Sequence, residues 1–304
     1  MQGQRPSVPV SSYIVVEANT KKIFDSFDPQ KKLPVASLTK VATAVTVLDW
    51  VEATNTPLST MVVVPASAHP TAVGGANPLG LQPGDRLSLR DALYAMLMAS
   101  DNASAMAVAD LVGRDLLRRT GRAADPIQHF VVQMNVLAHR LGMTRTLFTN
   151  PHGLDHYNGP QPYSTAADMA RLALEATSRS SFLFYSSQTN RVVNVQGQLG
   201  TRKLKVTNTN QLVGRQRIDG LKTGTTMAAG PCLILTADRP PKINQMPDGR
   251  TQVTPQRIVV VVLNAIDRFG LGNQLLNNGW RGYDSWYANG MGYTETTEFL
   301  NGLQ

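Results

Sequence analysis

Apolar residues follow a helical period in the middle of the chain and strand-like runs towards its two ends. Between residues 37 and 51 they are spaced by three and four, at Leu38, Val41, Ala42, Val45 and Leu48, which predicts a helix. Two β-prone runs, 13–17 and 22–27, flank an Asn-containing turn and predict a hairpin. Similar patterns predict helices over 88–98, 103–120, 126–142, 165–178 and 267–288, and strands at 61–64, 191–195, 204–207, 220–225, 232–237 and 258–264.

The order of these elements predicts the fold class. A hairpin comes first, helices occupy the middle of the chain, and strands fill the last third. Runs of helices followed by runs of strands are typical of α+β proteins. We expect an antiparallel sheet, made from the terminal hairpin and the late strands, packed with a central all-helical lobe. The chain has no internal repeat and no long linker, so we expect one domain with two lobes, covering approximately 12–288.

Composition narrows the class of protein without naming a function. Hydrophobic residues make up 42% of the 304 positions and charged residues only 16%, as in an ordinary globular protein. The net charge is +8, which suggests an anionic neighbour. However, no basic run interleaves with aromatic residues, so nucleic acid is not predicted as a partner. The chain contains no run of 18 apolar residues, so no transmembrane helix is predicted. The N-terminus has no apolar stretch typical of a signal peptide.

The first candidate for chemistry is Ser37-Leu38-Thr39-Lys40, at the start of a predicted helix. Residues three apart lie on one helix face, so the two polar side chains can meet. A serine hydroxyl is a weak nucleophile that needs an adjacent base, and a lysine serves when its pKa is depressed. The alternative is a capping serine beside a surface lysine, because this spacing is common in proteins.

Two further segments follow in the chain, Ser100-Asp101-Asn102 and Lys222-Thr223-Gly224. In the first, a serine can pass a proton and an asparagine can hold a substrate amide. In the second, a strand can present a cation, a hydroxyl and a glycine that lets substrate backbone approach. Taken alone, the first motif is better explained by helix capping and the second by an ordinary strand with a turn.

The three motifs together, in this order and in these contexts, are the set used by penicillin-binding proteins and class A β-lactamases. The chain resembles the D-alanyl-D-alanine carboxypeptidase family of low-molecular-mass penicillin-binding proteins over roughly 12–288. The flanking segments are more specific than the motifs themselves. They are 34–40, 141–144, 150–155, 163–168 and 219–224.

The resemblance implies a role for each motif residue. Ser37 would attack the carbonyl between two D-alanines, Lys40 would take its proton, and Ser100 would relay a proton to the leaving group. Asn102 would hold the substrate amide, and Lys222 would tune the electrostatics. Thr223 and Thr225 would bind the terminal carboxylate, and Gly224 would let the substrate backbone approach. The N–H groups of Ser37 and Thr225 would form an oxyanion hole. The implied substrates are peptidoglycan peptides, and the implied covalent inhibitors are β-lactam antibiotics. The implied location of the protein is outside the cytoplasm, either periplasmic or extracellular.

Some positions depart from the pattern of this family. Asp101 stands where many members have glycine, Thr225 where many have histidine, and Thr209 where many have arginine. Only 80 residues follow Gly224, so a further C-terminal β domain is not expected. These departures keep a D,D-endopeptidase, which cuts cross-links, as the alternative to a carboxypeptidase.

Two other functions stay open from the sequence. A class A β-lactamase would need a glutamate to activate the deacylating water, and none of the chain's glutamates lies in the expected loop. An inactive wall-binding module would keep the fold but lose catalysis. No metal or other cofactor is predicted, because the five histidines lack the spacing of metal ligands.

Overall fold

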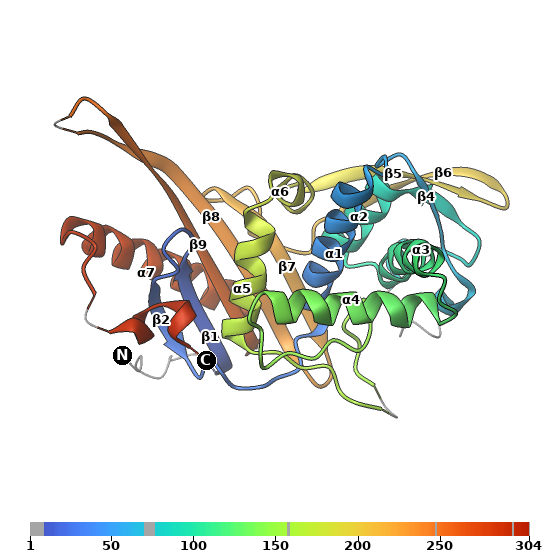
Figure 1. The fold of residues 1–304 in the computed structure, drawn as a ribbon, viewed down its shortest axis with the longest axis horizontal. Coiled ribbons are helices and arrows are strands. Elements are labelled where there is room, and N and C mark those ends of the chain that lie inside the picture. The colour runs from blue at the N-terminus through green and yellow to red at the C-terminus, as the bar shows by residue number, and fades with distance from the viewer. Residues whose placement is uncertain (1–8, 70–76, 157–158, 247, 294, 304) are drawn as a thin grey trace.

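A central antiparallel sheet and a helical lobe make up most of the molecule (Figure 1). The computed structural model describes residues 9–69, 77–156, 159–246, 248–293 and 295–303. Within these residues the helices are α1 (Thr39–Thr54), α2 (Leu89–Met98), α3 (Asn102–Thr120), α4 (Pro126–Arg140), α5 (Ala166–Thr177), α6 (Ser180–Ser186) and α7 (Arg268–Ala288). The strands are β1 (Val10–Glu17), β2 (Ile23–Phe27), β3 (Met61–Val63), β4 (Arg86–Ser88), β5 (Asn190–Gly197), β6 (Gly200–Thr207), β7 (Ile218–Thr226), β8 (Gly230–Gln245) and β9 (Thr251–Ala265).

The larger sheet joins the two ends of the chain. Its strand order is β2-β1-β9-β8-β7, and every pairing is antiparallel. The N-terminal hairpin therefore pairs with late strands, and the α+β prediction is confirmed. Strand β7, which carries the third motif, is an edge strand of this sheet.

Both faces of the sheet are covered. Alternate side chains of a strand point to opposite faces. In β9, Val259 and Val261 pack with helices of the central lobe, whereas Val260 and Val262 pack with α7. This two-sided burial explains why the segment 258–263 is apolar without alternation. Figure 1 shows α7 on one side of the sheet and α5 with the helical lobe on the other.

A second sheet was not anticipated from the sequence. Strands β5 and β6 pair with one another and, through β4, with β3, in the order β3-β4-β5-β6. They lie over the helical lobe and do not join the larger sheet (Figure 1). Strands β3 and β4 have only three residues each, which is too short for a clear period in sequence.

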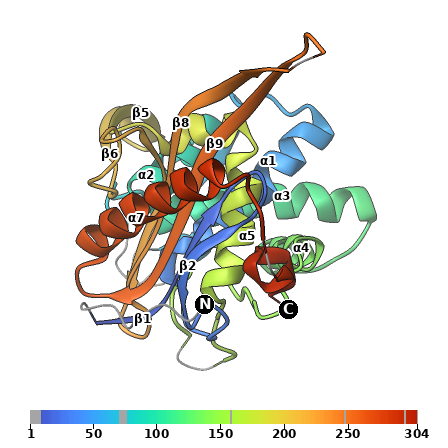
Figure 2. The same cartoon turned by 90° about the vertical axis from the view of Figure 1, so that its left-hand side faces the viewer.

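Strands β8 and β9 continue past the larger sheet as a two-stranded arm. The pairing of β8 with β7 ends at Ala237, and the pairing of β9 with β1 ends at Ile258. Beyond these points the two strands pair only with one another, Asp238–Gln245 with Thr251–Arg257. Figure 2 shows this arm projecting from the body of the molecule. Arg239 stacks on Trp280 of α7 at 4.2 Å, and Lys242 on Tyr287 at 3.8 Å, so cation–π contacts hold one side of the arm to the helix.

Two glycines let α7 lie close to the sheet. A Cβ on Gly272 would stand 2.9 Å from Leu233 Cδ2, and a Cβ on Gly279 would stand 2.7 Å from Val15 Cγ1. These positions are seven residues apart, so they fall on the same face of the helix. Helix α7 therefore contacts the strands through backbone, and this contact sets where its first residue, Arg268, stands relative to β7.

We expect Gly279→Leu to lower the free energy of unfolding by about 1–3 kcal/mol, because the added side chain overpacks the contact between α7 and β1. Denaturant unfolding followed by circular dichroism would measure this. The matched control is Gly292→Ala, since nothing lies within 4 Å of a Cβ at Gly292. Equal stability of the two variants would contradict the close packing of α7.

Candidate active site

The candidate nucleophile lies on a short 3-10 turn just before the first helix. Ser37 is in η1 (Ala36–Leu38), and Lys40 is in the first turn of α1. The sequence prediction of an α-helix from residue 37 is therefore wrong for the nucleophile itself. The pairing of the two side chains is present, since Lys40 Nζ lies 2.8 Å from Ser37 Oγ.

Lys40 is fully buried and is surrounded by oxygen acceptors. Besides Ser37 Oγ, its Nζ donates to Asn102 Oδ1 at 2.6 Å and to the backbone oxygen of His152 at 2.9 Å. Burial lowers the pKa of Lys40 to about 7, against a smaller opposing effect of Asp101. Near neutral pH a large fraction of this amine is therefore unprotonated and able to accept a proton.

The second motif lies between α2 and α3, as predicted. Ser100 is partly buried and has a left-handed backbone, with φ of +63°. Asp101 is buried and caps α3, because its carboxylate accepts a hydrogen bond from Ser104 N at 2.7 Å. Asn102 begins α3, and its Oδ1 accepts a hydrogen bond from Lys40 Nζ. Asp101, in the middle of the motif, thus stabilises the first turn of α3, where Asn102 lies.

The third motif lies on the edge strand β7, directly against the nucleophile. Lys222, Thr223 and Gly224 are buried, and Thr225 is exposed. A Cβ on Gly224 would lie 2.9 Å from Ser37 N, so only glycine lets the strand come this close. Burial lowers the pKa of Lys222 well below its usual value, with further contributions from Lys40 and Arg268. The structure thus brings the first and third motifs into contact.

Arg268 is a candidate site residue that the sequence motifs did not reveal. Its Nη1 donates to Gly224 O and to Thr225 Oγ1, both at 2.7 Å. It comes from the first turn of α7, 46 residues after Lys222, in a segment with no recognisable motif. The guanidinium places a positive charge at the end of the third motif, where Thr225 stands instead of a histidine.

Thr209 connects the third motif to the helical lobe. Its hydroxyl lies 2.6 Å from Thr223 Oγ1, and its backbone N donates to Met98 O at the end of α2. The neighbouring Asn210 donates to Gly220 O on β7. The segment 208–210 therefore holds β7 in place and does not contribute a cation.

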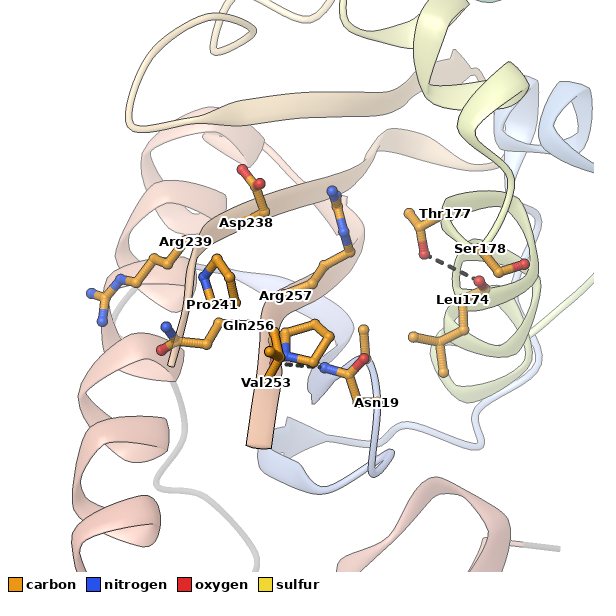
Figure 3. A pocket seen from close by; sticks show the side chains of 12 residues that line it. Asn19, Leu174, Thr177, Ser178, Asp238, Arg239, Pro241, Val253, Gln256 and Arg257 are labelled. Carbon is orange, nitrogen blue, oxygen red and sulfur yellow. Dashed lines mark hydrogen bonds between the residues drawn. The ribbon is translucent and has the colours of Figure 1, made fainter. Parts of the chain in front are cut away.

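Other features of the described residues do not compete with this site. A pocket of about 380 Å³ lies between α5 and the base of the β8–β9 arm (Figure 3). None of the motif residues lines it, and its charged groups are paired, as in Arg257 with Asp219. In the part of the chain that the structure describes, no group of three His, Cys, Asp or Glu residues could hold a metal ion, and no helix is long and apolar enough to cross a membrane.

Comparison with known proteins shows the family of the chain. A sequence model described as D-alanyl-D-alanine carboxypeptidase matches residues 1–246. The chain belongs to the D-alanyl-D-alanine carboxypeptidase family. The resemblance inferred from the motifs and their flanks is thereby confirmed.

Relatives within and around this family include both kinds of D,D-peptidase. The D-alanyl-D-alanine carboxypeptidase DacC of Escherichia coli is 29% identical, over 93% of this chain and 64% of its own length. A D-alanyl-D-alanine endopeptidase of Pseudomonas aeruginosa is 30% identical, over 85% of this chain and 72% of its own length. Penicillin-binding protein D2 of Listeria monocytogenes, solved with cefotaxime bound, is 26% identical, with a TM-score of 0.71 over 91% of this chain and all of its own. The chain thus spans just under two thirds of the length of DacC.

The pKa of Lys40 is open to direct measurement. We expect the ¹³Cε signal of Lys40 in ¹³C-lysine-labelled protein to titrate with a midpoint near pH 7. Asp101→Asn should move the midpoint lower, because the Asp101 carboxylate raises the pKa of Lys40 and the asparagine keeps the cap on α3. Asp248→Asn, on the turn of the distant arm, is the control. A midpoint in the ordinary range of an exposed lysine would contradict the role of burial.

Proposed function

We propose that the chain is a serine D,D-peptidase of peptidoglycan stem peptides, acting as a D-alanyl-D-alanine carboxypeptidase through an acyl-enzyme on Ser37. Ser37 Oγ attacks the carbonyl carbon of the penultimate D-alanine, and its proton passes to Lys40 Nζ. The backbone N–H groups of Ser37 and Thr225 hold the oxyanion. Ser100 relays a proton to the amine of the leaving D-alanine, and water then hydrolyses the ester.

The 2.8 Å contact between Lys40 Nζ and Ser37 Oγ is the observation that carries serine-based acyl transfer. A nucleophile within hydrogen-bond reach of its base, with the base held by further partners, is the arrangement this chemistry requires. Asn102 and the carbonyl of His152 hold the amine in place. The lowered pKa of Lys40 makes it a suitable proton acceptor at neutral pH.

Arg268 supports a substrate that carries a carboxylate next to the leaving amine. A terminal D-alanine leaves with a free carboxylate, and guanidinium is well suited to binding carboxylate. Thr223, Gly224 and Thr225 line the same strand end that Arg268 contacts. Many family members have histidine at the position of Thr225 or arginine at that of Thr209. In this chain Arg268 of α7 supplies the positive charge instead.

D,D-endopeptidase activity is the second candidate, because the strand end beyond Gly224 is open. Thr225 is exposed, and Met227 is 97% exposed on the following turn. This leaves space for a leaving group longer than one alanine. The relatives include proteins named D-alanyl-D-alanine endopeptidase.

The contacts of the glutamates disfavour a β-lactamase. Each of the five glutamates contacts a polar partner that is not part of the three motifs. The pairs are Glu17 with Thr20, Glu52 and Glu175 with Arg179, Glu295 with Thr297, and Glu298 with Lys22. Without a glutamate to activate water, a penicilloyl ester on Ser37 is expected to hydrolyse slowly. We therefore propose that β-lactams act as covalent inhibitors, as the cefotaxime-bound Listeria relative suggests, and that the protein works outside the cytoplasm, where peptidoglycan lies.

A fluorescent penicillin tests the nucleophile. We expect covalent labelling of the protein, visible after denaturing electrophoresis, and complete loss of labelling in Ser37→Ala, since the ester cannot form. Ser11→Ala, at the N-terminal strand, serves as the control. Labelling that persists in Ser37→Ala would remove Ser37 from the mechanism, and an unlabelled parent protein would favour the inactive wall-binding module.

Digestion of purified muropeptides, followed by mass spectrometry, separates the two peptidase activities. We expect pentapeptides to lose one alanine. Conversion of cross-linked dimers to monomers, with pentapeptides left intact, would instead identify an endopeptidase.

Substitution of the cation tests the carboxylate site. Arg268→Gln should lower kcat/KM for release of terminal D-alanine by about 10- to 100-fold, the size expected for losing a charged hydrogen bond. The control is Arg281→Gln, an exposed arginine on the same helix. Unchanged kcat/KM in Arg268→Gln would exclude this residue from carboxylate binding.

A further inference from the structure

The loop 150–155 contacts three separate parts of the candidate site. The carbonyl of His152 accepts a hydrogen bond from Lys40 Nζ. Gly153 packs on the nucleophile's turn so closely that a Cβ there would lie 1.9 Å from Ala36 O. Asp155 then reaches the far side of the site, at the end of β7. One short segment therefore connects the base, the nucleophile and the strand that carries Thr225.

Asp155 makes the last of these connections with both carboxylate oxygens. Oδ1 accepts a hydrogen bond from Thr226 Oγ1 at 2.9 Å, and Oδ2 accepts one from Ala228 N at 3.1 Å. Thr226 Oγ1 in turn accepts a hydrogen bond from Ala229 N at 3.2 Å. Thr226 is the last residue of β7, so these bonds fix the strand end and the turn that follows it.

The loop that carries Asp155 is itself held in shape. Asn150 Oδ1 accepts hydrogen bonds from His152 N and Gly153 N, and Asn150 Nδ2 donates to Leu154 O. Thr43 of α1 donates to Pro151 O at 2.6 Å. A rigid loop tied to α1 at one end can transmit its position to β7 at the other.

We propose that Asp155 is a positioning residue for acylation, holding the Thr225 N–H where the oxyanion forms by anchoring Thr226 and Ala228. This inference rests on the proposed function, because it assigns the oxyanion hole to Ser37 and Thr225. Thr225 immediately precedes the anchored residue. Arg268 of α7 binds the hydroxyl of Thr225, and Asp155 of the loop binds the hydroxyl of the next residue, so the two contacts together hold the backbone beyond Gly224. A donor aimed at the developing oxyanion lowers the barrier only while it keeps its position.

Acylation by a penicillin, resolved into a binding constant and a rate constant from its dependence on concentration, tests the proposal. We expect Asp155→Ala to lower the acylation rate constant by about 10- to 100-fold with the binding constant nearly unchanged, since misplacement of a donor affects the transition state. Asp155→Asn, which can still accept one of the two hydrogen bonds, should lose less. The pH midpoint of acylation should stay where it is in the parent protein, because Lys40 and its three acceptors are untouched.

Thr226→Val removes the same link from the other side and guards against a folding defect in Asp155→Ala. It removes one of the two hydrogen bonds to Asp155, so it should lower the rate constant by no more than Asp155→Ala does. The double variant should lose little more than Asp155→Ala, because the bond between the two side chains is already absent in that single variant. Asp248→Ala is the matched control, because Asp248 also accepts a backbone N–H, from Arg250, but in the turn of the arm.

The outcomes separate this inference from the proposed function. A parent protein that no penicillin acylates would overturn the proposed function. If the parent protein is acylated and the folded Asp155→Ala and Thr226→Val variants are acylated at the parental rate, only the role of Asp155 is overturned. A loss confined to the binding constant, or additive losses in the double variant, would also overturn it.

Discussion

The burial of the Lys40 amine is the constraint on which the rest of the site depends. A protonated amine has three N–H donors, and Lys40 has three acceptors in Ser37 Oγ, Asn102 Oδ1 and His152 O. A neutral amine has two donors and one lone pair. The amide and carbonyl oxygens can only accept, so they retain the two donors, and the lone pair must face the Ser37 hydroxyl. Burial brings the pKa of Lys40 to about 7. The two oxygen acceptors then orient the neutral amine so that its lone pair faces Ser37.

This arrangement requires segments from both lobes to meet at one point. Asn102 comes from the start of α3, His152 from the loop before α5, and Ser37 from the turn before α1. The edge strand closes the site, because Gly224 allows β7 to lie against Ser37 N. Burial and, to a smaller extent, the charges of Lys40 and Arg268 lower the pKa of Lys222 on that strand, so the helical lobe takes part in setting the charge of a residue on the sheet.

The sequence predicted the parts of this site that are encoded locally. Ser37 and Lys40 are three residues apart, and Asn102 follows a helix end, so their spacing and the order of the three motifs along the chain pointed to them. Arg268 could not be found in this way, because its place beside Thr225 depends on how α7 packs on the sheet through Gly272 and Gly279. The second sheet was missed because β3 and β4 are too short to show a period, and the arm because prolines interrupt the strand pattern at 240–241.

The position of the positive charge has a consequence for specificity. Where the leaving amine of a cross-link is attached to an α-carbon, that carbon also bears a carboxyl group. A guanidinium beside Thr225 can therefore serve a terminal D-alanine and a cross-bridge alike. Discrimination between them must come from the space available to the side chain of the leaving residue. That space borders Thr225 and Met227, both exposed, so the turn after β7, and not the charged centre, is where carboxypeptidase and endopeptidase activities can diverge.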